Sequence, residues 1–366
     1  MKLIPFFLLM IPLSVFSQNN VNEGTSPVND ELVKKIIATQ KPDGRFGEAG
    51  LVFDPNQLTG NHIVNIQHVT GQDVIRNTYT YKTIGDLHIL ADVYRKNDNL
   101  VRPAILWIHG GALIGGNRRS LNTVQAEKYL NAGYTIISID YRLAPQIKLQ
   151  QIIEDLKDAY QWVRGEGPKL FRVDPDRIAV IGHSAGGYLT LMAGFVLKPS
   201  PRALVSFYGY GDIAGEWYSR PDPFYNQQPL VSKEEAYKAA GTKIISDDTD
   251  WSRMPFYLYT RQHGLWPLEV VGHDPDKEPG EFGPFCPLRN VTRDYPPTLL
   301  LHGDNDTDVP YEQSVMMSNE LERQGIQHEL ISMAGHGHGF DAAMEDPEID
   351  ATFDRVLKFL DGLMKP

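Results

Sequence analysis

A serine lies at the centre of the segment Gly182-His183-Ser184-Ala185-Gly186. An apolar, β-branched run precedes it (177–181) and a helix-like run follows it (187–193), which predicts a sharp strand–turn–helix. A serine hydroxyl is a weak nucleophile until a base takes its proton, and such a turn exposes the hydroxyl at the positive end of a helix. A chain with 32 glycines holds this pattern by chance now and then. The flanking strand and helix argue against chance and predict that Ser184 is a nucleophile.

Acyl transfer at a serine also needs donors for the negative oxygen that develops in the transition state. The segment His109-Gly110-Gly111-Ala112 directly follows an apolar strand that ends at Ile108. Its glycines allow the backbone to curl so that N–H groups face a pocket, and the N–H of Ala185 is a further candidate donor. Gly110, Gly111 and Ala185 are therefore predicted to form an oxyanion hole. A plain strand-to-helix turn is the alternative reading of the glycine pair.

A nucleophilic serine also needs a base and an acid that orients this base. The acid is expected in a loop after a late strand. Three aspartates compete there, Asp304, Asp306 and Asp308. Spaced acidic residues also suggest calcium, but an EF-hand loop needs glycine and glutamate at its sixth and twelfth positions, where Val309 and Val315 stand. Calcium is therefore excluded for this loop. Asp308 lies close to a predicted helix start, where a carboxylate favours the helix dipole, so a structural role is expected for it.

Two histidines, His336 and His338, are candidates for the base, in a glycine-rich loop after the last predicted strand. A His-x-His pair can also bind a metal ion. No third group of ligands with suitable spacing accompanies the pair, so neither a metal nor another cofactor is predicted.

The elements that must position these residues alternate along the chain. Continuous apolar strands followed by helices predict an α/β fold, with a mostly parallel central sheet and helices on both faces. Strands are expected at 78–83, 87–94, 104–108, 135–139, 178–181, 203–206, 298–301 and 327–331. Helices are expected at 120–132, 152–164 and 351–363, and after Ser184 and Pro310.

A long segment, about 209–293, interrupts this alternation and contains thirteen aromatic residues. An insertion of this length inside a compact domain is usually a lid or a binding element. It should emerge at the same edge of the sheet as Ser184, which favours a lid. A subdomain that only buries its own aromatic side chains is the alternative.

Residues 1–17 have the pattern of a secretory signal peptide. Lys2 precedes a short apolar core, and Val15 and Ser17 supply the small residues that a cleavage site needs. The apolar run is shorter than the roughly 18 residues that span a bilayer, and no cysteine for a lipid follows it. The sequence therefore predicts an exported, periplasmic or secreted protein with no stable membrane anchor, whose single domain comprises 18–366.

Cys286 is the only cysteine, so the chain forms no internal disulfide and depends on its core for stability. A thiol nucleophile at Cys286 is the alternative, but the residue lies in a loop rich in proline and glycine with no histidine near it in sequence. We interpret it as a small filler residue. The net charge of −11 disfavours nucleic acid or an anionic membrane as a partner.

The chain resembles the α/β-hydrolases, in particular the hormone-sensitive-lipase-like and related serine esterase group, over 104–340. The matching motifs are Trp107-Ile108-His109-Gly110-Gly111, Asp140-Tyr141-Arg142-Leu143-Ala144-Pro145, Gly182-His183-Ser184-Ala185-Gly186-Gly187, His302-Gly303-x-x-Asp306-x-x-Val309-Pro310 and His338-Gly339-Phe340. The family's acid stands three residues before Val-Pro and its base stands before Gly-Phe. The resemblance therefore implies Asp306 as the acid and His338 as the base, and an α/β-hydrolase fold with the triad order Ser, Asp, His. Ala112 stands where many relatives have a third glycine.

Five polar residues outside this set have less specific readings. Arg118 and Arg119 follow the oxyanion segment and could hold a substrate carboxylate, or form a solvated turn. Asp140 and Arg142 are expected to brace the sheet. His183, next to the nucleophile, is expected to pack or to form hydrogen bonds locally.

These observations predict an exported serine hydrolase that cleaves carboxylic esters, with a small molecule or an acylated carbohydrate as substrate. A peptidase on the same fold is one alternative. A protein with the hydrolase fold that has lost catalysis and only binds is the other. The sequence predicts no particular oligomeric state.

Overall fold

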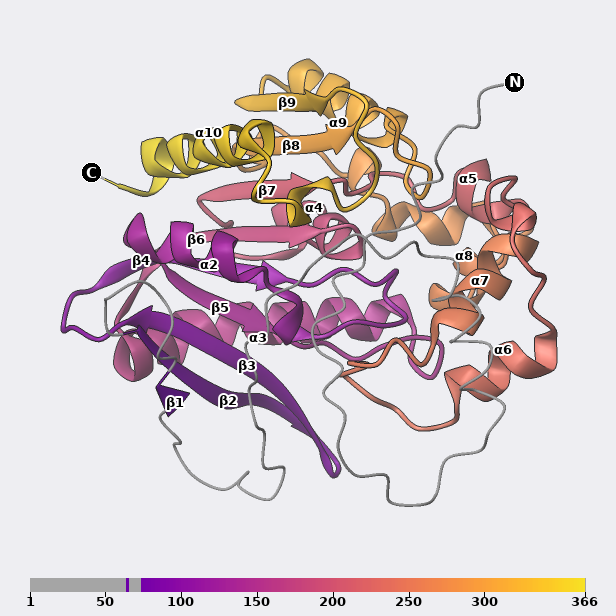
Figure 1. The fold of residues 1–366 in the computed structure, drawn as a ribbon, viewed down its shortest axis with the longest axis horizontal. Coiled ribbons are helices and arrows are strands. Elements are labelled where there is room, and N and C mark those ends of the chain that lie inside the picture. The colour runs from indigo at the N-terminus through magenta and orange to yellow at the C-terminus, as the bar shows by residue number, and fades with distance from the viewer. Residues whose placement is uncertain (1–63, 66–73, 366) are drawn as a thin grey trace.

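The computed structural model describes residues 64–65 and 74–365 of the chain. A nine-stranded sheet with the order β1-β2-β3-β5-β4-β6-β7-β8-β9 forms its centre (Figure 1). The strands are β1 (Val64–Asn65), β2 (Val74–Ile84), β3 (Leu87–Lys96), β4 (Arg102–Ile108), β5 (Thr135–Ile139), β6 (Val173–His183), β7 (Ala203–Phe207), β8 (Thr298–Gly303) and β9 (His328–Met333). The predicted signal peptide, residues 1–17, lies outside the described residues.

Helices cover both faces of this sheet (Figure 1). They are α2 (Thr123–Asn131), α3 (Leu149–Phe171), α4 (Ala185–Val196), α5 (Glu216–Ser219), α6 (Lys233–Ala240), α7 (Met254–His263), α8 (Trp266–Val270), α9 (Glu312–Gln324) and α10 (Pro347–Met364). Alternate residues of β4 enter separate cores, because successive side chains of a strand point to opposite faces. Leu106 packs in one core with α3, α4 and α9, and Trp107 packs in the other with α2 and α10. The predicted α/β-hydrolase fold is confirmed.

The six strands from β4 to β9 run parallel, whereas β1, β2 and β3 pair in antiparallel fashion. Parallel strands all end at one edge of a sheet, so the loops that follow them gather there. The register pairs Ile108 at the end of β4 with Gly182 near the end of β6. The glycine-rich segment after β4 therefore lies beside Ser184.

Helix α3 is longer than predicted. The expected helix at 152–164 extends to Phe171 and contains Pro168, although the sequence around Gly165 reads as a helix end. Tertiary packing accounts for the difference, because the Phe171 ring centroid lies 5.3 Å from Trp162 and 5.8 Å from Tyr79 of β2. The remaining predicted strands and helices are present, with ends that differ by a few residues.

The segment between β7 and β8 consists of short helices, from α5 to α8, beyond the carboxyl ends of the strands (Figure 1). Many of its aromatic side chains stack on one another. The ring centroids of Trp217 and Tyr218 are 3.6 Å apart, and those of Tyr218 and Trp266 are 4.1 Å apart. The insertion therefore has a core of its own. None of the helices in the described part of the chain is long and apolar enough to span a bilayer.

Buried ion pairs brace the sheet near its carboxyl edge, as predicted for Asp140 and Arg142. The Arg142 guanidinium donates to Asp155 of α3 with an Nε–Oδ2 distance of 2.8 Å. Asp140 accepts from Arg118, whose Nη1 lies 2.5 Å from Oδ2. A buried charge is costly to leave unpaired, so both pairs fix the loops that they join.

Replacing Gly186 by alanine tests whether close contact between α4 and β4 holds the nucleophile turn. A Cβ at Gly186 would lie 2.1 Å from the carbonyl oxygen of Ile108, so we expect the free energy of unfolding to fall by about 1–3 kcal/mol. Gly165 is the matched control, because a Cβ there meets no heavy atom within 4 Å. Alanine is favoured over glycine in a helix, so Gly165→Ala should be neutral or stabilising. Urea unfolding measures both, and an unchanged stability of Gly186→Ala would contradict the close contact.

Candidate active site

Ser184 lies between β6 and α4 in a turn that only small neighbours permit. Its φ is +56°, in the left-handed region, and its N–H donates to the carbonyl of Phe207 at 2.9 Å. A Cβ at Gly182 would lie 2.2 Å from the carbonyl oxygen of Gly186. The turn is therefore strained and tightly enclosed, which is the geometry that projects a nucleophile from the end of a strand.

The segment after β4 curls next to this turn. Gly111 has a φ of +109° and Ala112 a φ of +54°, so the residue in place of the common third glycine takes a left-handed conformation. A Cβ at Gly110 would lie 2.9 Å from the carbonyl oxygen of His183. Among the described residues, no carbonyl accepts a hydrogen bond from the N–H of Gly110 or Gly111. Ala185 is the first residue of α4, so its N–H has no partner within the helix.

The side chain of Asp306 is fully buried, and both of its oxygens are hydrogen-bonded. Oδ1 accepts from the N–H groups of Asp308 and Val309, at 2.8 and 2.9 Å. Oδ2 lies 2.8 Å from Nδ1 of His338 and 3.2 Å from Nε2 of His302. Burial alone would raise the pKa of Asp306, but the charge of His338 and the hydrogen bonds hold it well below its usual range. Asp306 is therefore a fixed carboxylate.

His338 lies in the loop after β9, and the structure brings it to Asp306. Burial would lower the pKa of His338, but the charges of Asp306 and Asp308 outweigh it and raise the pKa to about 9. His336 does not share this site, because its Nε2 lies 3.7 Å from Glu348 at the start of α10. Asp304, another of the three aspartates considered as the acid, accepts a hydrogen bond from the N–H of Gly335.

The prediction that Asp308 favours the dipole of the next helix is wrong. Helix α9 begins four residues later, and its N-cap is Tyr311. Asp308 is buried, and its Oδ1 accepts from the hydroxyls of Tyr225, at 2.7 Å, and Tyr257, and from Arg261 at 2.7 Å. Its Oδ2 lies 3.4 Å from Nε2 of His338. The partners belong to the insertion, far from Asp308 in sequence, so no local pattern indicated them.

A second cluster that the sequence did not indicate lies beside the nucleophile. His183 Nδ1 lies 2.8 Å from Oδ2 of Asp341, and the hydroxyl of Tyr208 donates to the same carboxylate. Gln125 of α2 also donates to Asp341, at 2.6 Å. The ring of Tyr208 lies 4.5 Å from that of His338. His183 therefore forms packing and hydrogen-bond contacts as predicted, but its carboxylate partner lies far along the chain.

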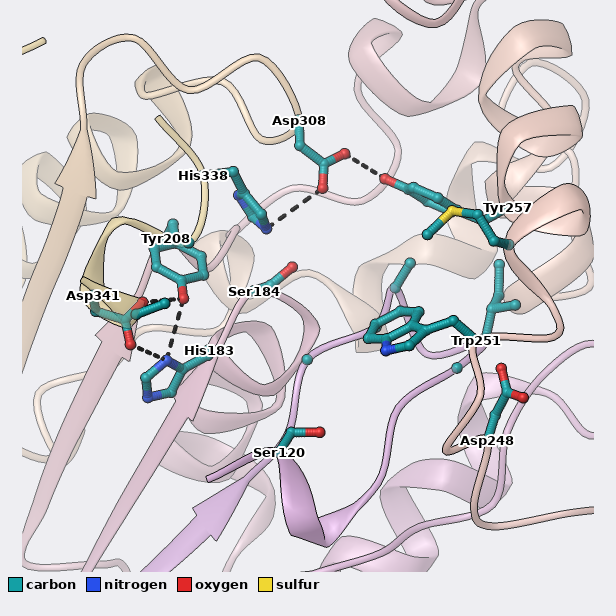
Figure 2. A pocket seen from close by; sticks show the side chains of 18 of the residues that line it. Ser120, His183, Ser184, Tyr208, Asp248, Trp251, Tyr257, Asp308, His338 and Asp341 are labelled. Carbon is teal, nitrogen blue, oxygen red and sulfur yellow. Dashed lines mark hydrogen bonds and ion pairs between the residues drawn. The ribbon is translucent and has the colours of Figure 1, made fainter. Parts of the chain in front are cut away.

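One pocket joins these parts, with Ser184, His338 and Asp308 around the same opening (Figure 2). The sheet loops supply one wall, and the insertion supplies the other through Asp248, Trp251, Arg253, Met254 and Tyr257. The insertion thus both buries aromatic rings of its own and borders the pocket. The pocket lining consists of Trp107, Gly110, Gly111, Ala112, Ile114, Gly115, Ser120, Asn122, Gln125, His183, Ser184, Tyr208, Asp248, Trp251, Arg253, Met254, Tyr257, Asp308, His338, Gly339, Asp341 and Ala342.

Three further candidates from the sequence lie outside this pocket. Arg118 is buried between Asp140 and Asp92, so both predicted readings, a carboxylate clamp and a solvated turn, are wrong for it. Arg119 bonds Asp247 at 2.7 Å and keeps 32% of its side chain exposed, in keeping with a solvated turn. Cys286 is buried, and burial raises the pKa of its thiol to about 11. A thiol with a raised pKa is a poor nucleophile, in keeping with the filler interpretation.

Comparison with known proteins identifies the family. The BD-FAE family model matches residues 91–321, more than half of the 366-residue chain. The chain belongs to the BD-FAE family. The matched segment runs from β3 to α9, so it contains the turn at Ser184 and the loop of Asp306. His338 lies beyond it.

Curated relatives of this BD-FAE chain include an esterase. Esterase LipC of Mycobacterium tuberculosis is 30% identical over 256 residues, which cover 69% of this chain and 57% of LipC. The non-reducing polyketide synthase Preu6 of Preussia isomera is 29% identical over 324 residues, covering 79% of this chain. The chain spans only 15% of the length of that synthase.

Solved structures share the fold. An α/β-hydrolase superfamily protein from Enterococcus faecalis matches with a TM-score of 0.59 and 22% identity, covering 78% of this chain and 98% of that protein. The esterase Est2 of Thermogutta terrifontis, with propionate bound, matches with a TM-score of 0.56 and 21% identity, covering 82% and 97%. The BD-FAE chain thus has the α/β-hydrolase fold, as the resemblance implied.

Because Asp306 pairs with protonated His338, we expect the protein to lose stability at alkaline pH. The pKa of His338 is raised from 6.5 to about 9 in the folded protein. Protonated His338 therefore stabilises the fold fully below about pH 6.5, and this contribution is lost as the pH rises through about 9. The difference in unfolding free energy between wild type and His338→Gln should shrink across this window, as denaturant unfolding at each pH would measure. Asp306→Asn should remove most of the same pH dependence, and a difference that is constant with pH would contradict the ion pair.

Proposed function

We propose that the protein hydrolyses carboxylic esters, with Ser184 as nucleophile, His338 as base and Asp306 as the acid that orients the base. The observation that carries this proposal is the hydrogen bond of 2.8 Å between Asp306 and Nδ1 of His338, at a pocket that Ser184 also lines. A carboxylate at Nδ1 leaves Nε2 as the nitrogen that exchanges a proton with the nucleophile. Esterase LipC among the relatives supports an ester as the substrate.

The reaction proceeds through an acyl-enzyme. Ser184 Oγ attacks the ester carbonyl carbon while its proton passes to Nε2 of His338, and the carbonyl π electrons move onto oxygen. The bond to the alcohol oxygen then breaks, and the alcohol leaves with the proton from Nε2. Water attacks the acyl-enzyme by the same route, which releases the carboxylic acid and restores Ser184. Asp306 stays ionised and stabilises the imidazolium that forms in each half.

The N–H groups of Gly110, Gly111 and Ala185 are proposed to bind the oxyanion. Two features support this assignment: these residues surround the nucleophile turn, and the N–H groups of the glycine pair have no carbonyl acceptor among the described residues. Donors that are already in place lose no free energy to reorganisation during the reaction, and removing one typically costs about 10²–10³ in rate.

We propose an acylated carbohydrate as the substrate class. The pocket combines the aromatic residues Trp251 and Tyr257 with the polar residues Asn122 and Asp248. Aromatic faces pack against sugar rings, and amide and carboxylate groups bind sugar hydroxyls. Solved neighbours include a carbohydrate esterase from gut microbiota, with a TM-score of 0.57, and an acetyl ester-xyloside bifunctional hydrolase from Caldicellulosiruptor lactoaceticus, with a TM-score of 0.54.

We also propose that the protein acts outside the cytoplasm. The pattern of residues 1–17 supports export, with cleavage before Gln18. Fractionation of cells that express the full chain, followed by N-terminal sequencing, tests this. Protein found only in the cytoplasm with its first residues intact would contradict export.

Replacing Ser184 by alanine should abolish ester hydrolysis. We expect kcat/KM for p-nitrophenyl esters to fall by at least about 10³, because water replaces the nucleophile but the oxyanion donors remain. An acetate-to-decanoate series measures both the loss and the size of the acyl pocket. Cys286→Ser is the control and should retain activity, because Cys286 does not line the pocket. Equal rates for wild type and Ser184→Ala would overturn the proposed mechanism.

Replacing Trp251 by alanine tests the carbohydrate assignment. Loss of an aromatic face should raise KM for an acetylated xylo-oligosaccharide about fivefold, since stacking of this size contributes about 1 kcal/mol. KM for p-nitrophenyl acetate, which has no sugar ring, serves as the internal control and should change much less. A parallel change for both substrates would remove the support for a sugar-binding face.

A further inference from the structure

The imidazole of His338 has a carboxylate at each of its nitrogens. Asp306 Oδ2 lies 2.8 Å from Nδ1, and Asp308 Oδ2 lies 3.4 Å from Nε2 (Figure 2). In a serine hydrolase, Nε2 should face the nucleophile. Among the described residues, no hydrogen bond joins Ser184 Oγ to His338. Asp308 is therefore the partner of Nε2, in the place where Ser184 is expected. Catalytic hydrogen bonds are often long before substrate binds, so this arrangement is compatible with a resting enzyme.

The position of Asp308 is fixed by the insertion. Tyr225 and Tyr257 donate their hydroxyls to Oδ1, and Arg261 contributes Nη1 at 2.7 Å. Arg261 is itself fully buried and also pairs with Asp222, with an Nη2–Oδ2 distance of 2.5 Å. These contacts are made to Oδ1 of Asp308 or hold Arg261 in place, so Oδ2 of Asp308 remains directed at His338. The insertion therefore sets the distance between a negative charge and the base.

The other groups around His338 are also accounted for. Asp306 bonds Nδ1 and is itself bonded by His302. The Tyr208 ring packs against the imidazole and donates its hydroxyl to Asp341, which pairs with His183. Asp341 raises the pKa of His338 less than Asp306 and Asp308 do. Of these groups, Asp308 is the one that contacts the reacting nitrogen.

We propose that Asp308 is a positioning residue for the base. Its carboxylate, which residues of the insertion hold in place, competes with Ser184 for Nε2 of His338. It thereby sets the pH range in which the base is unprotonated. This inference rests on the proposed function, because it requires His338 to be the base. In the resting enzyme the Nε2 proton is shared with Asp308. Catalysis begins when that proton is lost to solvent and the Nε2 lone pair can accept the proton of Ser184.

The charge of Asp308 determines the direction of the effect. A negative charge at this distance favours protonated imidazole and opposes the free base. The lower pH limit of kcat/KM, which reports the base of the free enzyme, should therefore lie at a higher pH with Asp308 than without it. Neutralising Asp308 should lower this kinetic pKa by about 1–3 units. At neutral pH the fraction of free base increases about tenfold for the first unit, and by less as the kinetic pKa approaches the assay pH.

The test compares pH profiles of Asp308→Asn, Tyr257→Phe and Asp248→Asn. Asparagine can still accept from Tyr225, Tyr257 and Arg261, so the fold should persist, which thermal unfolding checks. Tyr257→Phe disturbs the same network but keeps the charge, and Asp248→Asn removes a pocket charge on the side away from His338 (Figure 2). Only Asp308→Asn should lower the kinetic pKa. An unchanged pKa in Asp308→Asn, or the same shift in all three variants, would overturn the proposal.

A second readout does not depend on turnover. NMR titration of isotope-labelled histidine in Ser184→Ala should show the imidazole of His338 titrating at lower pH once Asp308→Asn is added. No shift would overturn the positioning role of Asp308 even if ester hydrolysis is confirmed. Failure of the proposed function would give a different result. The wild-type protein would then show no ester hydrolysis that depends on Ser184, at whatever pH His338 titrates.

Discussion

The hydrogen-bonded pair of Asp306 and His338 is the interaction on which the rest of the site depends. It joins the loops after β8 and β9, and the parallel sheet brings both loops to the edge where β6 delivers Ser184. The pair is stable because Asp306 is held by backbone N–H groups and by His302, which compensate its charge. A buried carboxylate without these partners would be protonated, and the imidazole would lose its orientation.

The insertion between β7 and β8 combines two properties that the sequence presented as alternatives. Its rings stack in a core of their own around the buried Arg261, whose guanidinium lies 4.9 Å from the ring centre of Tyr218 and 4.7 Å from that of Tyr225. The same arginine reaches Asp308 at the pocket. A rigid aromatic core is thus coupled by an ion pair to the group that faces the base. This coupling gives the insertion a physical means of influencing the chemistry without contacting the nucleophile.

Much of the fold was predictable because buried parallel strands are continuous apolar runs, and the turn at Ser184 was predictable because its residues are adjacent in sequence. Asp306 and His338 were selected by family resemblance, since their own segments offered several acids and two histidines. Asp308 was misread and Asp341 was missed because their partners are tens of residues or more away, and only the folded chain brings them together. The end of α3 was misplaced for a related reason: packing of Phe171 outweighs the local preference of glycine and proline to end a helix.

The central claim is that Ser184 carries the acyl group during turnover. Intact-protein mass spectrometry after rapid mixing with p-nitrophenyl acetate, followed by peptide mapping, tests it directly. The account predicts a transient gain of one acetyl group, located on the peptide that contains Ser184, which decays as free acetate appears. Rapid hydrolysis without any covalent adduct, or an adduct on another residue that accumulates and decays at the rate of turnover, would contradict the account.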